Sequence, residues 1–114
     1  MAELEHETLN VAFDLQRQFL KHINRATALD AAIFEQFGET EETVYELEQL
    51  QNTRERATAF YSRLHMLLLR ISEAQPVATY ATLDLLARTI QEGQATDAAI
   101  AASLEEIRRN WSLP

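Results

Sequence analysis

The sequence predicts an all-α protein made of a long antiparallel helical hairpin and a short helical hairpin. Only two glycines and two prolines interrupt its 114 residues, at Gly38, Pro76, Gly93 and Pro114. Between these helix breakers, apolar side chains recur at steps of three and four, which is the period of a helix with one buried face. No segment alternates apolar and polar residues in the manner of a half-buried strand. The chain therefore divides into two long and two short predicted helices.

The long hairpin is expected over residues 8–74, with one helix ending near residue 37 and the next starting at residue 41. Gly38 suits the end of the first helix, because glycine adopts positive φ without steric cost. Thr40 suits the start of the second, because a threonine hydroxyl can cap free backbone N–H groups. The short connection between the two helices makes them antiparallel neighbours.

The short hairpin is expected over residues 77–111. Pro76 disfavours helical geometry in the residue before it and so ends the second helix. Gly93 is interpreted as the end of a third helix, and Thr96 as the cap of a fourth that begins with Asp97. All four helices are assigned to one domain over residues 1–114, because a chain of this length supports a single core.

The unequal helix lengths predict a missing partner. At 1.5 Å per residue the long helices span about 45–50 Å and the short ones about 22–24 Å, so half of the long hairpin has no cover. A homodimer is expected to cover it and to complete a four-helix bundle, because large exposed apolar surfaces are rare on monomers and twofold dimers are the commonest oligomers. The expected dimer interface consists of Leu29, Ile33, Phe34, Phe37, Val44, Leu47 and Leu50.

Composition excludes several function classes. The chain has no cysteine, which rules out disulfides, thiolate metal ligands and thiol nucleophiles. Its net charge of −8 disfavours nucleic acids and anionic membranes, which attract proteins through lysine and arginine. The acidic first residues lack the form of a signal peptide, and the longest apolar run, residues 66–69, is far shorter than a membrane span. We therefore expect a cytoplasmic protein.

Candidate catalytic and metal-binding groups are sparse. His22 and His65 are expected to lie on the order of 13 Å apart along the hairpin, too far apart to share a metal ion. Glu3 and His6 have the Glu-x-x-His spacing of di-iron bundles, but the motif occurs only once. No glycine-rich phosphate loop is present. No catalytic residue, metal or cofactor is assigned, and the chain is not expected to be an enzyme.

Two alternatives remain open. Arg17 and His22 resemble the Arg-x4-His motif of the HEPN class of helical ribonucleases, and the resemblance implies a small helical ribonuclease or a toxin-type enzyme. It covers six residues, and in that class the motif lies toward the C-terminal part of a four-helix domain, whereas here it lies in the first helix. The other alternative is a small-molecule sensor with a ligand between the helices, lined by Phe60, Tyr61 and Tyr80.

The leading prediction is a non-catalytic protein–protein interaction module, such as an adaptor, assembly factor or small regulator, that acts through its helical surfaces. Residues 30–48, at the end of the long hairpin, contain seven acidic residues and no lysine or arginine. Such a concentration of charge can steer a basic partner, although glutamate is also favoured at helix N-termini for structural reasons. The predicted partner-binding residues are Glu39, Glu41, Glu42 and Glu46.

Arginines on the second predicted helix form a separate pattern. Arg56, Arg63 and Arg70 recur every seven residues and so share one side of that helix. They are expected to form ion pairs with carboxylates of another helix or of the dimer mate. Arg54 lies on the apolar seam itself, where a single polar residue can fix the register of two helices.

Overall fold

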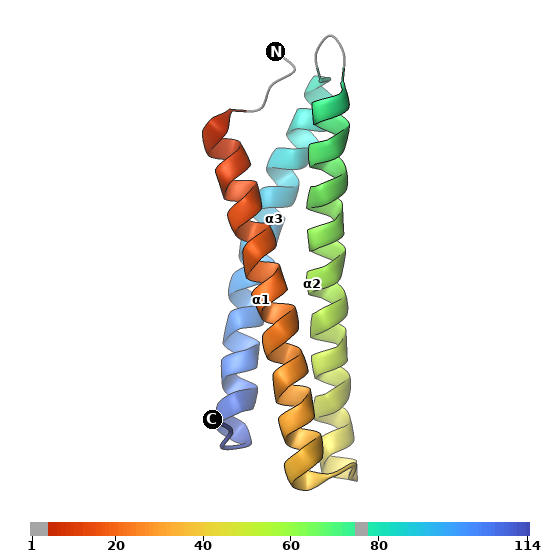
Figure 1. Cartoon of the computed structure of the whole chain (residues 1–114), viewed down its shortest axis with the longest axis vertical. Coiled ribbons are helices and arrows are strands. Elements are labelled where there is room, and N and C mark those ends of the chain that lie inside the picture. Colours follow the sequence, from red (N-terminus) through yellow and green to blue (C-terminus); the bar gives the residue numbers. More distant parts are fainter. Residues whose placement is uncertain (1–4, 75–77) are drawn as a thin grey trace.

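A computed structural model describes residues 5–74 and 78–114 of the chain. These residues form three α-helices and no strand: α1 over His6–Phe37, α2 over Glu41–Glu73 and α3 over Tyr80–Asn110. The helices pack into an elongated bundle of 57 × 19 × 17 Å, in which α1 and α2 run antiparallel (Figure 1). The prediction of an all-α protein is confirmed.

The turn between α1 and α2 follows from its local sequence. Gly38 adopts φ 71°, and its N–H donates to the Phe34 carbonyl at 2.9 Å, which ends α1. Thr40 and Thr43 then cap α2 reciprocally: the Thr43 N–H donates to Thr40 Oγ1 at 3.2 Å, and the Thr40 N–H donates to Thr43 Oγ1 at 2.7 Å. The buried Thr43 hydroxyl also donates to the Gly38 carbonyl at 2.8 Å. This network fixes the conformation of the turn between the two long helices.

The C-terminal part of the chain differs from the prediction. Residues 80–110 form the single helix α3 instead of a hairpin of two short helices, so the described chain forms three helices and not four. Gly93 and Thr96 both lie inside α3, where neither ends nor starts a helix. Pro76, the predicted end of the second helix, lies outside the described residues, and α2 ends before it at Glu73.

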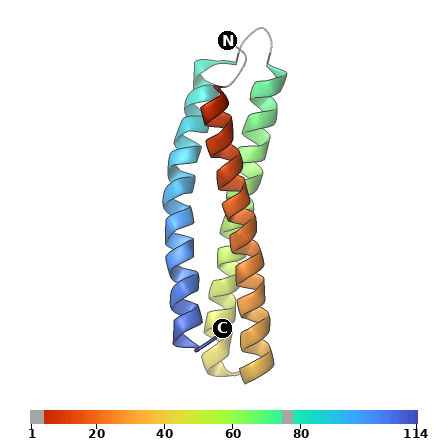
Figure 2. The ribbon, with the colours of Figure 1, turned by 60° about the vertical axis from the view of Figure 1, so that its left-hand side comes forward.

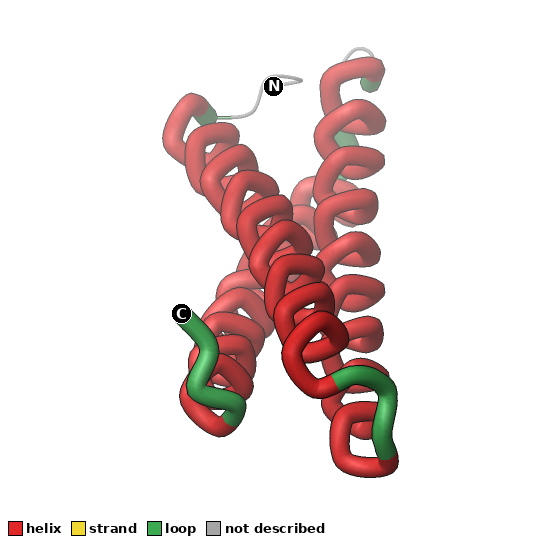
Figure 3. Tube along the Cα trace, turned by 60° about the horizontal axis from the view of Figure 1, so that its bottom comes forward, coloured by secondary structure: helices red, strands yellow, loops and turns green. Residues whose placement is uncertain are grey.

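Gly93 faces side chains of both α1 and α2. Figure 3 shows α1 and α3 crossing at an angle. A Cβ atom added to Gly93 would lie 3.4 Å from Leu15 Cδ1, 3.6 Å from Phe60 Cδ1 and 3.7 Å from Phe19 Cε2. These are ordinary van der Waals distances, and the packing of α3 against α1 and α2 offsets the propensity cost of about 1 kcal/mol that glycine has in a helix. A glycine ends a helix only where it takes positive φ, and of the two glycines only Gly38 does so.

Gly93→Ala is expected to raise the free energy of unfolding by about 0.5–1 kcal/mol, because alanine favours a helix interior and its Cβ would meet only ordinary contacts. Urea unfolding followed by circular dichroism measures the change. Gly38→Ala is the matched control and is expected to lower stability by about 1 kcal/mol or more, because its φ and ψ of 71° and −168° suit only glycine. Equal losses in the two variants would show that position 93 has no room for a Cβ atom and would contradict this prediction.

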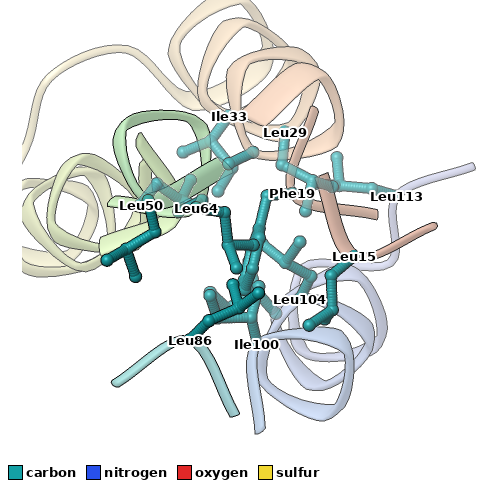
Figure 4. Close-up of a cluster of buried hydrophobic side chains, with 14 of the residues drawn as sticks. Leu15, Phe19, Leu29, Ile33, Leu50, Leu64, Leu86, Ile100, Leu104 and Leu113 are labelled. Carbon is teal, nitrogen blue, oxygen red and sulfur yellow. The ribbon is translucent and has the colours of Figure 1, made fainter. Parts of the chain in front are cut away.

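A continuous apolar core runs along the axis of the bundle, with side chains from all three helices interleaved (Figure 4). At its centre, the fully buried ring of Phe19 stacks on Phe60 with 5.5 Å between ring centroids. The other large apolar side chains that are fully buried are Ile33, Leu50, Leu64, Ile71, Leu86, Ile100 and Leu104.

α3 covers the half of the α1–α2 hairpin that was expected to need a partner. At 31 residues it is about 46 Å long, and its C-terminal end lies at the same end of the bundle as the α1–α2 turn (Figure 2). There the Trp111 and Phe37 rings lie 5.1 Å apart. Leu29, Ile33 and Leu50 are consequently buried within one chain. The predicted mismatch of helix lengths was wrong, because the two short helices are one long helix.

Candidate interaction surfaces

The predicted dimer-interface residues divide into two groups. Three of them belong to the core of a single chain, as described above. The other four remain at the surface: Phe34 and Phe37 are exposed, and Val44 and Leu47 are half-buried. Val44 and Leu47 line a shallow groove between α1 and α2, beside Arg54, whose Nη1 lies 3.2 Å from Asp30 Oδ2. Only the second group is available to another molecule.

The predicted acidic surface lies at the α1–α2 turn and on the first turns of α2. Glu39, Glu41 and Glu42 are exposed, and Glu46 is half-buried. Glu41 and Glu42 occupy the first turn of α2, where negative charge is favourable next to the free N–H groups of the helix. Their position therefore has a structural reason, and a role in partner binding remains a prediction.

His22, one of the two residues of the ribonuclease alternative, points into the bundle. Its Nε2 lies 2.6 Å from Asp97 Oδ1, and its ring packs edge-on against Phe19 with 6.4 Å between centroids. Asp97 was predicted to begin a fourth helix, but it lies within α3 and joins α3 to α1. A carboxylate that orients a histidine occurs in hydrolytic triads, yet here the pair bridges two helices of the core.

The structure does not bring Arg17 and His22 together. Arg17 is exposed, and its Nη1 lies 3.1 Å from Asp14 Oδ1 on the same helix. Residues five apart on a helix point about 140° away from each other, so His22 lies on a different face. One chain therefore offers no shared site for these two side chains, and the geometry lends the ribonuclease alternative no support.

The aromatic residues of the sensor alternative are also separated. Phe60 stacks on Phe19 inside the bundle, and Tyr61 packs against the core from α2. Tyr80, at the start of α3, is 92% exposed. These three side chains do not line a common cavity.

Metal ligands do not gather in the described part of the chain: residues 5–74 and 78–114 contain no group of three or more histidine, aspartate or glutamate side chains that could hold a metal ion. His6 begins α1. Glu3, its predicted companion in the Glu-x-x-His spacing, lies outside the described residues.

Glu105 joins the C-terminal part of α3 to α1. Its carboxylate oxygens lie 2.6 Å from Arg108 Nη2 and 2.7 Å from Arg25 Nη2. The hydrogen bond from Arg108 lowers the pKa of Glu105 from 4.5 to about 2; desolvation opposes the change and Arg25 adds to it. The same carboxylate raises the pKa of Arg108, whose Nη1 also donates to the Leu113 carbonyl at 3.1 Å. The end of the chain is thus anchored to the bundle.

Glu105→Gln is expected to destabilise the protein near pH 7 and to have no effect on stability near pH 2. A carboxyl whose folded pKa is about 2 contributes stability above its unfolded value of 4.5 and loses that contribution as the pH falls toward 2. Urea unfolding at a series of pH values between these limits measures the change, with Glu106→Gln as the control on the same helix. A destabilisation that stays constant down to pH 2 would contradict the ion-pair role.

A groove that the sequence analysis did not predict runs between the C-terminal half of α2 and the N-terminal half of α3. One part of this open groove has a volume of about 550 Å³, and the adjoining part has a volume of about 400 Å³. Met66 and Arg70 line both parts. Met66, Leu69 and Leu85 are exposed in it, although they are large apolar side chains. The groove depends on the N-terminal half of α3 packing beside α2, and the pattern of either helix alone does not reveal it.

The charged residues of this groove are unevenly paired. Arg63 Nη1 lies 3.7 Å from Glu92 Oε2 of α3, so the predicted pairing of this arginine with another helix is observed. Arg88 pairs with Asp84 one turn earlier on α3, at 3.1 Å. Arg70 lines both parts of the groove and has no carboxylate within 4.0 Å among the described residues. One guanidinium group is therefore available to a carboxylate from outside the chain.

Comparison with protein-family models, with curated proteins and with solved structures finds no match to this chain. None of the helices in the described residues is long and apolar enough to cross a membrane.

Proposed function

We propose that this chain is a non-catalytic protein–protein interaction module that binds a helix of a partner protein in the α2–α3 groove. The observation that carries the proposal is the exposure of Met66, Leu69 and Leu85 in one groove between two packed helices. Amphipathic helices bind other proteins by laying their apolar face into such grooves. The chain would then act as an adaptor, assembly factor or small regulator.

The chemistry of the groove defines the partner. Methionine is unbranched and adapts its shape to different apolar side chains, which suits Met66 to a docking surface. Within residues 5–74 and 78–114, no carboxylate lies within 4.0 Å of Arg70, whose guanidinium group offers a planar pair of donors to an aspartate or glutamate. We therefore expect a helix with apolar side chains three and four residues apart and an acidic residue at its edge. The acidic end of the bundle, with Glu39 and Glu42, remains a second proposed contact, for a basic partner.

Affinity capture with matched variants tests the proposal. Wild-type protein and Met66→Glu are immobilised and exposed to extract of the source cells, with Tyr45→Glu as the control at the other end of α2. Each of these side chains is exposed, so circular dichroism should show unchanged folding. A partner bound by the wild type and Tyr45→Glu should be reduced at least about tenfold on Met66→Glu, because a charge placed in an apolar contact costs more than 1.4 kcal/mol.

Direct binding then identifies the mode of recognition. A peptide that spans the captured partner's helix is titrated against the wild type and against Arg70→Glu. The substitution should weaken binding, and exchange of the peptide's acidic residue for lysine should restore part of it. Capture that is identical for all variants would overturn the groove assignment, and co-purification of RNA whose cleavage requires His22 would favour the ribonuclease alternative.

A further inference from the structure

We propose that a pocket between the first turns of α2 and the last turns of α3, the Tyr45 pocket, binds an arginine side chain of a basic partner. This inference rests on the proposed interaction function, because it assigns a site and a ligand to the acidic end of the bundle. The site is separate from the α2–α3 groove. The two helix ends that form it lie at the end of the bundle that carries the α1–α2 turn (Figure 2).

The lining of the Tyr45 pocket is partly apolar and partly polar. The pocket has a volume of about 300 Å³. Its apolar lining comes from Ile107, which is buried, and from Tyr45, which is exposed. The rest of the lining consists of Glu46, Gln49, Ser103, Glu106 and Asn110. An arginine side chain combines an apolar stem with a planar cation, so it matches both parts of this lining.

Two carboxylates from different helices line the pocket without a counter-charge. Within residues 5–74 and 78–114, no arginine, lysine or histidine nitrogen lies within 4.0 Å of the Glu46 or Glu106 carboxylate. Arg109, on the next turn of α3, lies 4.0 Å from Glu105 instead. An arginine from a partner would therefore supply a positive charge that the described part of the chain does not provide.

The fold offers no reason for a negative charge at Glu106. The carboxylates on the first turn of α2 lie next to free N–H groups, which favour them. Glu106 lies instead near the C-terminal end of α3, where free carbonyl groups favour positive charge. Its neighbour Glu105 is compensated by Arg108 and Arg25, at 2.6 and 2.7 Å. A residue that breaks a local rule without an intrachain gain is typical of a functional position.

A guanidinium group suits this arrangement better than an ammonium group does. Its planar face stacks on an aromatic ring such as that of Tyr45, whereas an ammonium group is a compact point charge. Its N–H groups donate to carboxylates in a fixed fork geometry. The side-chain oxygens of Gln49, Ser103 and Asn110 can accept the N–H groups that the carboxylates leave free.

The surroundings of the pocket are also acidic. Glu42 is exposed and lies one turn before Glu46 on the same side of α2. The next arginine on that side, Arg56, follows ten residues after Glu46, which is about 15 Å along the helix. A field of one sign around a pocket attracts ligands of the opposite sign. The charge of this end therefore selects a basic partner over an acidic or neutral one.

Nuclear magnetic resonance of the isotope-labelled full chain tests the site. The probe is capped arginine, Nα-acetyl-arginine amide, added at low salt so that screening of the carboxylates stays small. The backbone amides of Tyr45, Gln49 and Ser103 should shift and saturate. Capped citrulline, which has nearly the same shape without the charge, should cause no shift, and capped lysine should bind more weakly. Equal binding of capped lysine would overturn the arginine assignment, and a lack of saturable shifts would overturn the site.

Charge-neutral variants locate the contact. Glu46→Gln and Glu106→Gln should each raise the dissociation constant of capped arginine about threefold, and the double variant about tenfold, because each substitution removes one ion pair. Glu39→Gln is the matched control: it removes a carboxylate from the same end of the bundle but outside the pocket, and it should leave the constant nearly unchanged. Equal effects of Glu39→Gln and Glu106→Gln would overturn the pocket, since binding would then depend only on the overall charge of this end.

This site and the α2–α3 groove fail independently. The Glu46→Gln and Glu106→Gln double variant should still bind the partner that the wild type captures through the groove. Met66→Glu should still bind capped arginine with the wild-type constant. If Met66→Glu instead abolishes arginine binding while circular dichroism shows unchanged folding, the arginine binds in the α2–α3 groove and the Tyr45 pocket is excluded.

Discussion

Phe19→Ala is expected to lower the free energy of unfolding by about 3–5 kcal/mol, the range for truncating a fully buried phenylalanine. The Phe19 ring lies where all three helices meet: it stacks on Phe60, packs against His22, and faces Gly93 on α3. Because neighbours on all three helices surround the ring, the chain cannot collapse fully into the cavity. The loss should therefore combine the missing apolar contacts with the cost of the void.

Urea unfolding followed by circular dichroism measures this loss. Small domains have total stabilities of about 5–15 kcal/mol, so the variant should unfold at a much lower urea concentration than the wild type. Tyr80→Ala is the control, because its side chain is 92% exposed and its truncation should change stability by about 0.5 kcal/mol or less. A loss below about 1 kcal/mol for Phe19→Ala would show that the three helices do not meet at this ring.

His22→Ala is expected to cost about 1–3 kcal/mol, because it leaves the partly buried Asp97 carboxylate without its partner across the α1–α3 contact. Asp97→Ala should cost a similar amount for the same reason. The double variant should cost less than the sum of the two, since residues in direct contact show coupling energies of about 0.5–3 kcal/mol. Denaturant unfolding of the four proteins in the cycle gives the coupling directly.

The exposed ion pair of Arg17 and Asp14 provides the comparison for this cycle. Surface pairs on one helix contribute about 0.3–0.5 kcal/mol, so a cycle of alanine substitutions at these two positions should show little coupling. Equal coupling in both cycles would contradict the interpretation of His22 and Asp97 as a contact that holds α3 against α1.

The sequence alone determined the helical class and the boundaries of the first two helices. The predicted ranges, residues 8–37 and 41–74, differ by at most two residues from His6–Phe37 and Glu41–Glu73. This agreement has a local cause. Gly38 has the positive φ that ends α1, and Thr40 caps the start of α2. Each of these residues lies next to the helix end that it determines.

Only the tertiary structure decided the role of Gly93, because that role depends on distant side chains. Leu15 and Phe60 lie 78 and 33 residues away in the sequence and yet pack against Gly93, and this contact keeps α3 continuous through a residue that disfavours helices by itself. Continuity of α3 in turn covered the half of the hairpin that contains Leu50 and brought Asp97 to His22. Helix periods and caps depend on residues that are close in the sequence. Which helix faces pack against one another depends on residues that are far apart in the sequence and meet only in the folded bundle.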